Sequence, residues 1–291
     1  MLGEGERIDE TNRSPIANTR RVPLSLPHDL NRRAWDARAR RSDWFTEPID
    51  DAAFARPLES LDQAGWLEGD VTRRRVLCLA AGGGRQGPLF AAAGAITTVF
   101  DLSAEMLARD VEVAAARGLD LRVVQGSMDD LSAFEPASFD IVCQPVSTCY
   151  VPDVGIVFRE IARVVVPGGI YISQHKQPTS LQSDVRPSPG GYLLREPYYR
   201  REPLPPVSGT VVREEGTLEY LHRWEQILGG ICRAGFVIED VLEPLLADPH
   251  GDPAGFARRS AFIPPYVRIK ARRRQRAAPP TTAPPLWTPG A

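Results

Sequence analysis

Short apolar runs alternate with longer segments of helical length through most of the chain. The apolar runs are rich in branched side chains and predict β-strands. They cover residues 76–79, 96–100, 121–124, 141–144, 170–173, 236–242 and 266–272. Strands that alternate with helices at this spacing favour a parallel α/β sheet.

Several of the segments between the strands carry helix-end signals. Ser103 suits an N-cap, Glu105 suits the first helical turn, and Gly118 ends the same helix. The run Pro167-Gly168-Gly169 ends a later helix. The expected helices cover residues 31–45, 50–64, 85–93, 103–117, 154–165 and 218–234.

The stretch from residue 75 to residue 101 carries the strongest local signal. Between its two strands, Gly82, Gly83 and Gly84 remove every Cβ where the chain must turn, which lets a ligand approach the backbone. The next helix begins at these glycines, so its free N–H groups face the turn. The second strand ends at Asp101, where a doubly wound sheet holds a ribose diol. The stretch therefore predicts a site for a nucleoside cofactor.

Three regions lie outside the strand–helix pattern. Residues 1–27 are polar and without period, and we expect them to be disordered. Residues 177–210 hold seven prolines and three tyrosines, and a segment of this kind is usually functional or disordered. A basic run at residues 272–276 leads into a Pro-rich tail, and we expect residues 273–291 to be disordered. For the basic run, a solvated surface is favoured over phosphate binding.

Composition narrows the function classes. The net charge of −2 gives no general attraction to nucleic acid or to an anionic membrane. The four cysteines form no metal-type pair, which favours reduced, buried thiols and no metal site. No apolar run is long enough to span a membrane, and the polar N-terminus does not read as a signal peptide. We therefore expect a soluble, cytoplasmic protein, as a monomer or a homodimer.

With these features in view, residues 66–272 resemble the class I S-adenosylmethionine-dependent methyltransferases. Asp101 matches the acidic end of the family's second strand, and residues 127–129 (SMD) match the pair that contacts adenine. Residues 159–169 (REIARVVVPGG) are similar to the family's R-x-L-x-P-G-G ending. The resemblance implies a Rossmann-like, mostly parallel seven-stranded sheet flanked by helices, with an antiparallel strand near the C-terminus. It places the methyltransferase domain at residues 28–272.

The glycine turn departs from the family pattern at two positions. The family often has D-x-G-x-G-x-G, where this chain has CLAAGGG over residues 78–84. The acidic position is therefore Cys78 and the first glycine is Ala80. The family's carboxylate helps to position the amino-acid end of the cofactor, so that contact must come from elsewhere in this chain.

The resemblance implies S-adenosyl-L-methionine as cofactor and roles for individual residues. Those expected to contact the cofactor are Ala80, Gly82, Gly83, Gly84, Asp101, Leu102, Met106, Ser127, Met128, Asp129, Gln144 and Pro145. Those expected near a small-molecule substrate are Ser147, Cys149, Tyr192, Tyr198 and Tyr199, with His175 and Tyr150 as candidate catalytic residues. For His175, a structural hydrogen-bonding role is as well supported as that of a general base. An inert thiol is favoured for Cys149, and a structural role inside helix 218–234 for His222.

Two segments are candidates to cover the site. Residues 28–66 contain an arginine-rich helix with Trp35. The favoured interpretation is that this helix packs the apolar stems of its arginines over the core. The alternative is that it forms a lid over the site. Residues 177–210 either cap the substrate, with their tyrosines facing the acceptor, or pack as a static loop.

Two alternatives to a methyltransferase stay open. The match Gly82-x-Gly84-x-x-Gly87 is also the dinucleotide fingerprint, which is typical of an NAD(P)-dependent oxidoreductase. The order of the later elements favours the methyltransferase. A non-catalytic protein that binds S-adenosylmethionine is the other alternative, because Cys78 and Ala80 depart from the family's turn. The sequence does not name the methyl acceptor.

Overall fold

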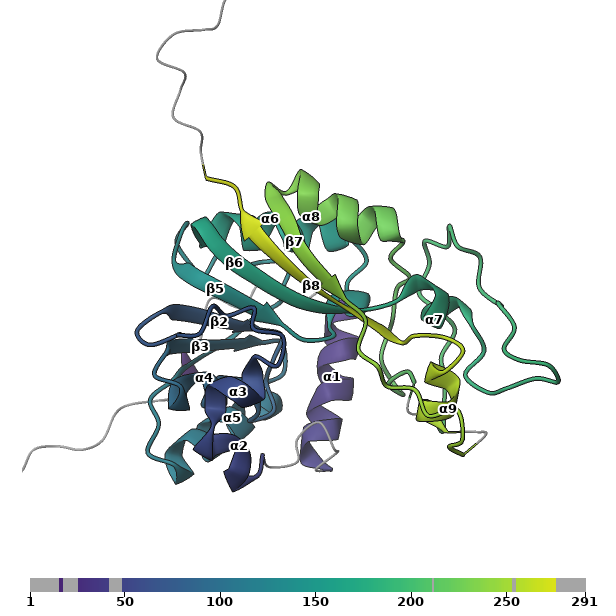
Figure 1. Cartoon of the computed structure of the whole chain (residues 1–291), viewed down its shortest axis with the longest axis horizontal. Coiled ribbons are helices and arrows are strands. Elements are labelled where there is room, and N and C mark those ends of the chain that lie inside the picture. The colour runs from purple at the N-terminus through teal and green to yellow at the C-terminus, as the bar shows by residue number, and fades with distance from the viewer. Residues whose placement is uncertain (1–15, 18–25, 42–48, 211, 253–254, 276–291) are drawn as a thin grey trace, which may run out of the picture.

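One mixed sheet forms the centre of the molecule, with the strand order β1-β4-β3-β2-β5-β6-β8-β7 (Figure 1). The structure is a computed structural model, and it describes residues 16–17, 26–41, 49–210, 212–252 and 255–275 of the 291-residue chain. The strands are β1 (Ile16–Ala17), β2 (Arg75–Leu79), β3 (Ile96–Asp101), β4 (Arg122–Gln125), β5 (Phe139–Gln144), β6 (Val165–Lys176), β7 (Phe236–Leu242) and β8 (Tyr266–Arg273). β8 runs antiparallel to both of its neighbours, and the other neighbouring pairs are parallel.

All seven strands expected from the sequence are present, which confirms the predicted fold class. β1 adds a two-residue edge strand beside β4, inside the segment 1–27 for which disorder was expected. Residues 1–15 and 18–25 of that segment lie outside the described residues, as do residues 276–291 of the expected tail. β6 begins at Val165, earlier than predicted, because the Pro-Gly-Gly run expected to end the preceding helix lies inside the strand. β8 extends to Arg273, the first residue of the segment for which disorder was expected.

Helices cover both faces of the sheet. α4 (Gln86–Ala92) and α5 (Ala104–Ala116) agree with the predicted helices, and the Ser103 hydroxyl caps α5 by accepting the N–H of Met106 at 3.1 Å. α6 (Val154–Val164) agrees as well. The helix predicted over residues 50–64 is instead two short helices, α2 (Asp51–Ala55) and α3 (Pro57–Leu61). The break lies at Arg56, because the residue before a proline is disfavoured in the helical region.

The helix predicted over residues 218–234 starts late. Helical turns begin at η3 (Glu225–Gly229) and continue into α8 (Gly230–Arg233), so His222 lies in the extended segment before them. Backbone hydrogen bonds to distant parts of the chain hold that segment: the N–H of Tyr220 donates to the carbonyl of Cys149 at 2.7 Å. His222 Nε2 lies 3.0 Å from the carbonyl oxygens of Thr148 and Val151. These tertiary bonds replace the helical ones that the local pattern predicted.

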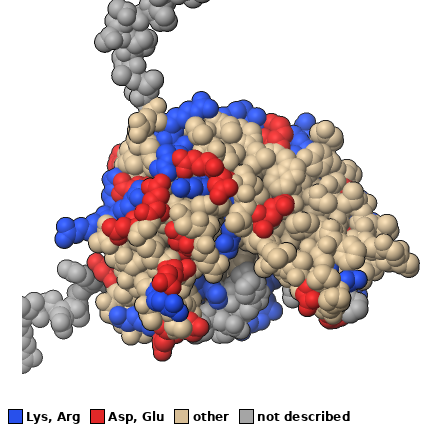
Figure 2. Space-filling model, viewed as in Figure 1, with Lys and Arg blue, Asp and Glu red and all other residues tan. Residues whose placement is uncertain are grey.

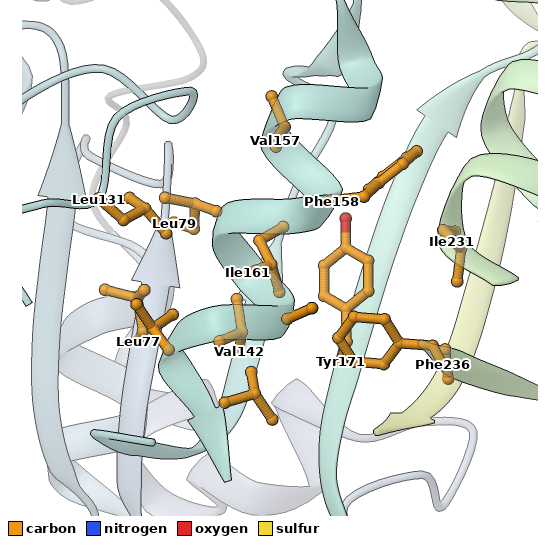
Figure 3. Packing of buried hydrophobic residues seen from close by; sticks show 14 of the residues in the cluster. Leu77, Leu79, Leu131, Val142, Val157, Phe158, Ile161, Tyr171, Ile231 and Phe236 are labelled. Atoms are coloured by element: carbon orange, nitrogen blue, oxygen red, sulfur yellow. The ribbon is translucent and has the colours of Figure 1, made fainter. Parts of the chain in front are cut away.

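The alternation of side chains along the strands separates two hydrophobic clusters. On β2, Leu77 and Leu79 face α6 and α8, whereas Val76 and Cys78 face α3, α4 and α5. Figure 3 shows the first cluster, in which Ile161 of α6 lies between the β2 leucines and Tyr171 of β6. Because both faces of the central strands are covered, a ligand can reach the sheet only at the strand ends.

Candidate functional site

A cavity of about 370 Å³ lies at the carboxyl ends of the parallel strands. Its wall combines the loops that follow β2, β3, β4 and β5 with the end of β6, the first residues of β8 and the helix α1 (Leu26–Arg40). Ligands of open α/β sheets bind at this edge. Of the residues predicted to contact the cofactor, those that line the cavity are Ala80, Gly82, Asp101, Leu102, Met106, Ser127, Met128, Gln144 and Pro145.

The three glycines after β2 have different roles: Gly82 lines the cavity, and the other two shape the turn. A Cβ on Gly82 would lie 2.8 Å from the Cβ of Met106 and 3.2 Å from that of Asp101, so only glycine fits at this point of the cavity wall. Gly84 has a φ of +76° and packs against α5, where a Cβ would lie 3.0 Å from the carbonyl oxygen of Arg109. Gly83 donates its N–H to Asp110 Oδ2 at 2.9 Å. Gly83 and Gly84 therefore shape the turn without lining the cavity, although both were predicted to contact the cofactor.

Asp101 joins three elements at the cavity wall. Its Oδ1 accepts the N–H of Ser103 at 2.9 Å, and its Oδ2 accepts the N–H of Gly82 at 3.0 Å. Burial raises the pKa of Asp101 to about 6, and these backbone donors oppose a larger rise. The carboxylate is therefore largely ionised at neutral pH, where it can accept hydrogen bonds from ligand hydroxyls.

A second buried carboxyl, that of Asp110 on α5, holds the glycine turn by accepting the N–H of Gly83. It is fully buried on α5, and burial raises its pKa to about 8 although backbone N–H groups of the turn favour its ionised form. The sequence analysis did not single it out. The only signal was an acidic residue on the inward face of a helix that packs against a glycine turn.

The loop after β4 meets the helix α1 at the cavity. Ser127 and Met128 line the cavity, whereas Asp129, also predicted to contact the cofactor, faces α1. Its Oδ1 accepts the Ser127 hydroxyl at 2.5 Å, and its Oδ2 lies 3.0 Å from His28 Nε2. Burial raises the pKa of Asp129, but the bonds from His28 and Ser127 outweigh it and hold the pKa below its usual range.

The helix α1 closes one side of the cavity, where Figure 1 shows it beside the ends of the central strands. Asn31 joins α1 to two segments, donating to the carbonyls of Tyr150 and Leu218 at 3.0 and 3.1 Å. Asp36 accepts the Ser103 hydroxyl at 2.5 Å. Trp35 lines the cavity and packs edge-to-face on Tyr150, with ring centroids 5.7 Å apart. The helix thus forms part of the cavity wall, and a lid function of residues 28–66 stays a prediction.

A buried ionic cluster lies behind the far end of the cavity, at the end of β6. Lys176 contacts Glu214 and lies 2.5 Å from Glu219, which in turn contacts Arg213. All four side chains are buried, and their charges balance. Glu214 is the cluster member that lines the cavity.

Tyr150 couples this cluster to the cavity. Its hydroxyl donates to Glu214 Oε2 at 2.8 Å, and its ring lines the cavity. Burial raises the pKa of Tyr150 well above its usual value, so the side chain is a donor and not a base. Burial also raises the pKa of Glu214, but Lys176 outweighs it and keeps this carboxylate ionised.

His175, predicted as a catalytic residue, does not line the cavity. It is fully buried, with Nδ1 2.8 Å from the Thr148 hydroxyl and Nε2 2.8 Å from the Ser173 hydroxyl. Burial lowers its pKa to about 3, so it stays neutral. Of the two roles left open by the sequence, these contacts favour the structural one. Cys149 is also buried outside the cavity lining, and burial raises the pKa of its thiol, which favours the inert role.

The tyrosines predicted to face the substrate lie away from the cavity. Tyr192 packs on Phe262, and the Tyr198 hydroxyl accepts the N–H of Trp224 at 3.4 Å. Tyr199 is three-quarters exposed. Within the described residues, segment 177–210 supplies no side chain to the cavity wall, whereas Ser147 of the β5 loop does. These positions favour the static loop over the cap.

Buried contacts hold segment 177–210 in place. Leu181 of α7 (Pro178–Gln182) and Leu204 pack with Tyr150 and Leu221 in one cluster. Arg259 of α9 (Phe256–Ser260) is also buried and donates to the hydroxyl and carbonyl of Ser180 at 2.9 and 2.8 Å. The segment therefore packs against Tyr150 of the cavity wall without lining the cavity itself.

Comparison with known proteins gives the family of this fold. Residues 77–173 match a family model described as a methyltransferase domain. An uncharacterized methyltransferase of Bacillus subtilis, YbaJ, is 32% identical over 228 residues, which is 73% of this chain and 89% of that protein. The ubiquinone biosynthesis O-methyltransferase of Paracidovorax citrulli is 34% identical over 119 residues, which span 39% of this chain and half of that protein.

Solved structures share the fold at low identity. An S-adenosylmethionine-dependent methyltransferase from Mesorhizobium loti superposes with a TM-score of 0.58 at 24% identity, covering 76% of this chain and all of that one. The geranyl diphosphate C-methyltransferase of Streptomyces coelicolor, solved with S-adenosyl-L-homocysteine, has a TM-score of 0.59 at 16% identity, covering 87% of this chain and all of that one.

Proposed function

The chain belongs to the class I S-adenosylmethionine-dependent methyltransferases, and we propose that its methyl acceptor is a small molecule whose hydroxyl or amine binds beside Glu214. The observation that carries the proposal is the ionised Glu214 carboxylate at one end of a cavity of about 370 Å³. A cavity of this size suits a cofactor and a small acceptor better than a macromolecular surface.

The cavity residues fit the cofactor. Asp101 would accept the ribose hydroxyls, Met128 would pack on adenine, and the missing Cβ of Gly82 would leave room for the methionyl chain. The bound cofactor supplies a methyl group that is already activated on a sulfonium. The protein then needs only to orient the acceptor and exclude water, and such orientation can lower a barrier by roughly 7–11 kcal/mol.

Glu214 and Tyr150 would orient the acceptor. Glu214 Oε2 is occupied by Tyr150 and Lys176, and we assign Oε1 to a hydroxyl or amine hydrogen of the acceptor. Because Lys176 keeps Glu214 ionised, this carboxylate can hold the acceptor by its hydroxyl or amine hydrogen and take up that proton as the bond to the methyl group forms. The ubiquinone O-methyltransferases among the relatives are named for transfer to oxygen, which supports a protic nucleophile.

The face of the molecule shown in Figure 2 gives no support to a nucleic-acid acceptor. Figure 2 shows positive and negative side chains interspersed over the sheet-bearing part of that face, and the lobe formed by segment 177–210 and α9 is mostly uncharged. Nucleic-acid binding would call for a continuous basic surface. In the described residues, no helix has the length and apolar character needed to cross a membrane.

Incubation with methyl-labelled S-adenosylmethionine and a metabolite extract tests the proposal. We expect label in a low-mass product, identified by chromatography and mass spectrometry. Glu214→Gln should slow this transfer by about tenfold or more, because a charged hydrogen-bond acceptor is lost. Glu215→Gln, at the exposed neighbouring position, is the control and should leave the rate unchanged. Label only in macromolecules, or full activity of Glu214→Gln, would contradict the proposal.

A further inference from the structure

Asp62, directly after α3, is a cavity carboxylate to which the function above assigns no role. It lines the cavity together with Trp66 and Leu67. Its Oδ1 accepts the N–H of Trp66 at 2.6 Å, and its Oδ2 accepts the N–H of Leu67 at 2.8 Å. These two backbone bonds fix the orientation of the carboxylate.

Asp62 shares the cavity wall with Cys143, which lies near the end of β5. Asp101 ends β3, and β2 lies between β3 and β5. The two carboxylates therefore belong to different parts of the wall, one at the end of β3 and the other on the α3–β2 connection.

Gln86 adds a second acceptor to the same wall. It lines the cavity at the first turn of α4, which packs against α3. Its Oε1 is buried and has no hydrogen-bond partner among the described residues. A buried oxygen without a partner is costly, so its presence at a cavity indicates that a ligand supplies the donor.

The turn after β2 offers no acid for the same purpose. Residues 78–84 contain no acidic side chain. Cys78 is fully buried in the apolar cluster that faces α3, α4 and α5. Of the acidic side chains on the cavity wall, Asp101 is assigned above to the ribose and Glu214 to the acceptor. Besides its sulfonium, the cofactor carries one cationic group, the α-ammonium. Asp62 is the acidic side chain of the cavity wall that is left to bind it.

We propose that Asp62 and Gln86 bind the α-ammonium group of the cofactor's methionyl end. An ammonium group carries three N–H donors, which two carboxylate oxygens and one amide oxygen can accept. The inference rests on the proposed use of S-adenosylmethionine, and it assigns recognition of the amino-acid end to the α3–β2 connection. The site should therefore distinguish the cofactor from nucleosides that lack this end.

Calorimetry with two probes tests the assignment. S-adenosylhomocysteine carries the amino-acid end, whereas 5′-methylthioadenosine keeps only the adenine, ribose and sulfur. We expect Asp62→Asn to weaken S-adenosylhomocysteine about ten- to hundredfold and to leave 5′-methylthioadenosine within about twofold of the wild type. Asp70→Asn is the matched control, because Asp70 also caps a turn, bonding the N–H of Thr72 at 2.8 Å, but lies outside the cavity lining. It should change neither affinity.

The outcomes separate this assignment from the proposed function. Unchanged S-adenosylhomocysteine affinity in Asp62→Asn would overturn the assignment alone, and so would an equal loss for both probes, which would indicate general damage to the cavity. A wild-type protein that binds neither probe would overturn the cofactor itself and the assignment with it. Gln86→Leu supplies an independent variant and should weaken S-adenosylhomocysteine selectively by a smaller factor.

Discussion

Replacing Lys176 by methionine should lower the free energy of unfolding by about 3–5 kcal/mol, because removing one partner of a buried ion pair leaves an uncompensated charge. Lys176 is the cation between Glu214 and Glu219, and both carboxylates are buried. In Lys176→Met they would repel each other in a medium that screens them poorly. The loss should shrink at pH 5, where Glu214, left without a cationic partner, can take up a proton. Urea denaturation at pH 5 and pH 8 measures both effects.

The chain provides a matched control, since its other lysine is Lys270. Lys270 lies 3.5 Å from Glu68 and 3.3 Å from Glu239, and Arg272 contacts both glutamates as well. These carboxylates are partly exposed, so Lys270→Met should cost only about 1 kcal/mol or less. An equally small loss for Lys176→Met would show that the buried cluster adds little to stability.

Replacing Asp101 should weaken S-adenosylhomocysteine by about 1.5–3 kcal/mol, the range for hydrogen bonds to a charged group, which is roughly 10- to 150-fold in the dissociation constant. The pKa of about 6 gives a second signature. Ribose hydroxyls donate best to the ionised carboxylate, so wild-type affinity should rise from pH 5 to pH 7 as Asp101 loses its proton. In Asp101→Asn this rise should disappear.

Asp101→Asn is a better variant than Asp101→Ala for this experiment. The carboxylate also accepts the N–H groups of Gly82 and Ser103, so alanine would leave both donors without a partner, whereas asparagine keeps one acceptor. Thermal unfolding of the variant without ligand separates loss of the turn from loss of the contact. Calorimetry that shows unchanged affinity and the same pH dependence would contradict the ribose assignment.

The fold could be predicted because its signals are local. An apolar run, three glycines and an acid at the end of the next strand define β2, α4 and β3 without any knowledge of distant residues. The same holds for α5, whose cap and glycine stop lie where Ser103 and Gly118 predict them. Local signals failed at residues 218–223, where bonds to the loop after β5 replace helical ones.

The site could be predicted only where it follows the strand ends. Asp101, Ser127 and Gln144 line the cavity because each ends or follows a strand. Glu214 escaped prediction because it meets Tyr150 across 64 residues of sequence, and neither residue lies in a motif. Asp62 escaped because an acid between a short helix and a strand carries no local sign of ligand binding.

Of the histidine and tyrosines predicted at the site, Tyr150 lines the cavity, whereas His175, Tyr192, Tyr198 and Tyr199 do not. His175 is only two residues beyond Ser173, which lines the cavity, yet its ring is buried between two hydroxyls away from it. The three tyrosines of segment 177–210 gave an aromatic composition that suits a cap, but composition does not indicate which way a loop folds.

Binding of S-adenosylhomocysteine and of NADPH to the wild-type protein tests the central claim most directly. At about 100 times its dissociation constant, S-adenosylhomocysteine should stabilise the folded state by about 2.7 kcal/mol, seen as a higher unfolding temperature, and calorimetry should show saturable binding. NADPH at the same concentration should leave the unfolding temperature unchanged. Stabilisation by NADPH with none by S-adenosylhomocysteine would contradict the account.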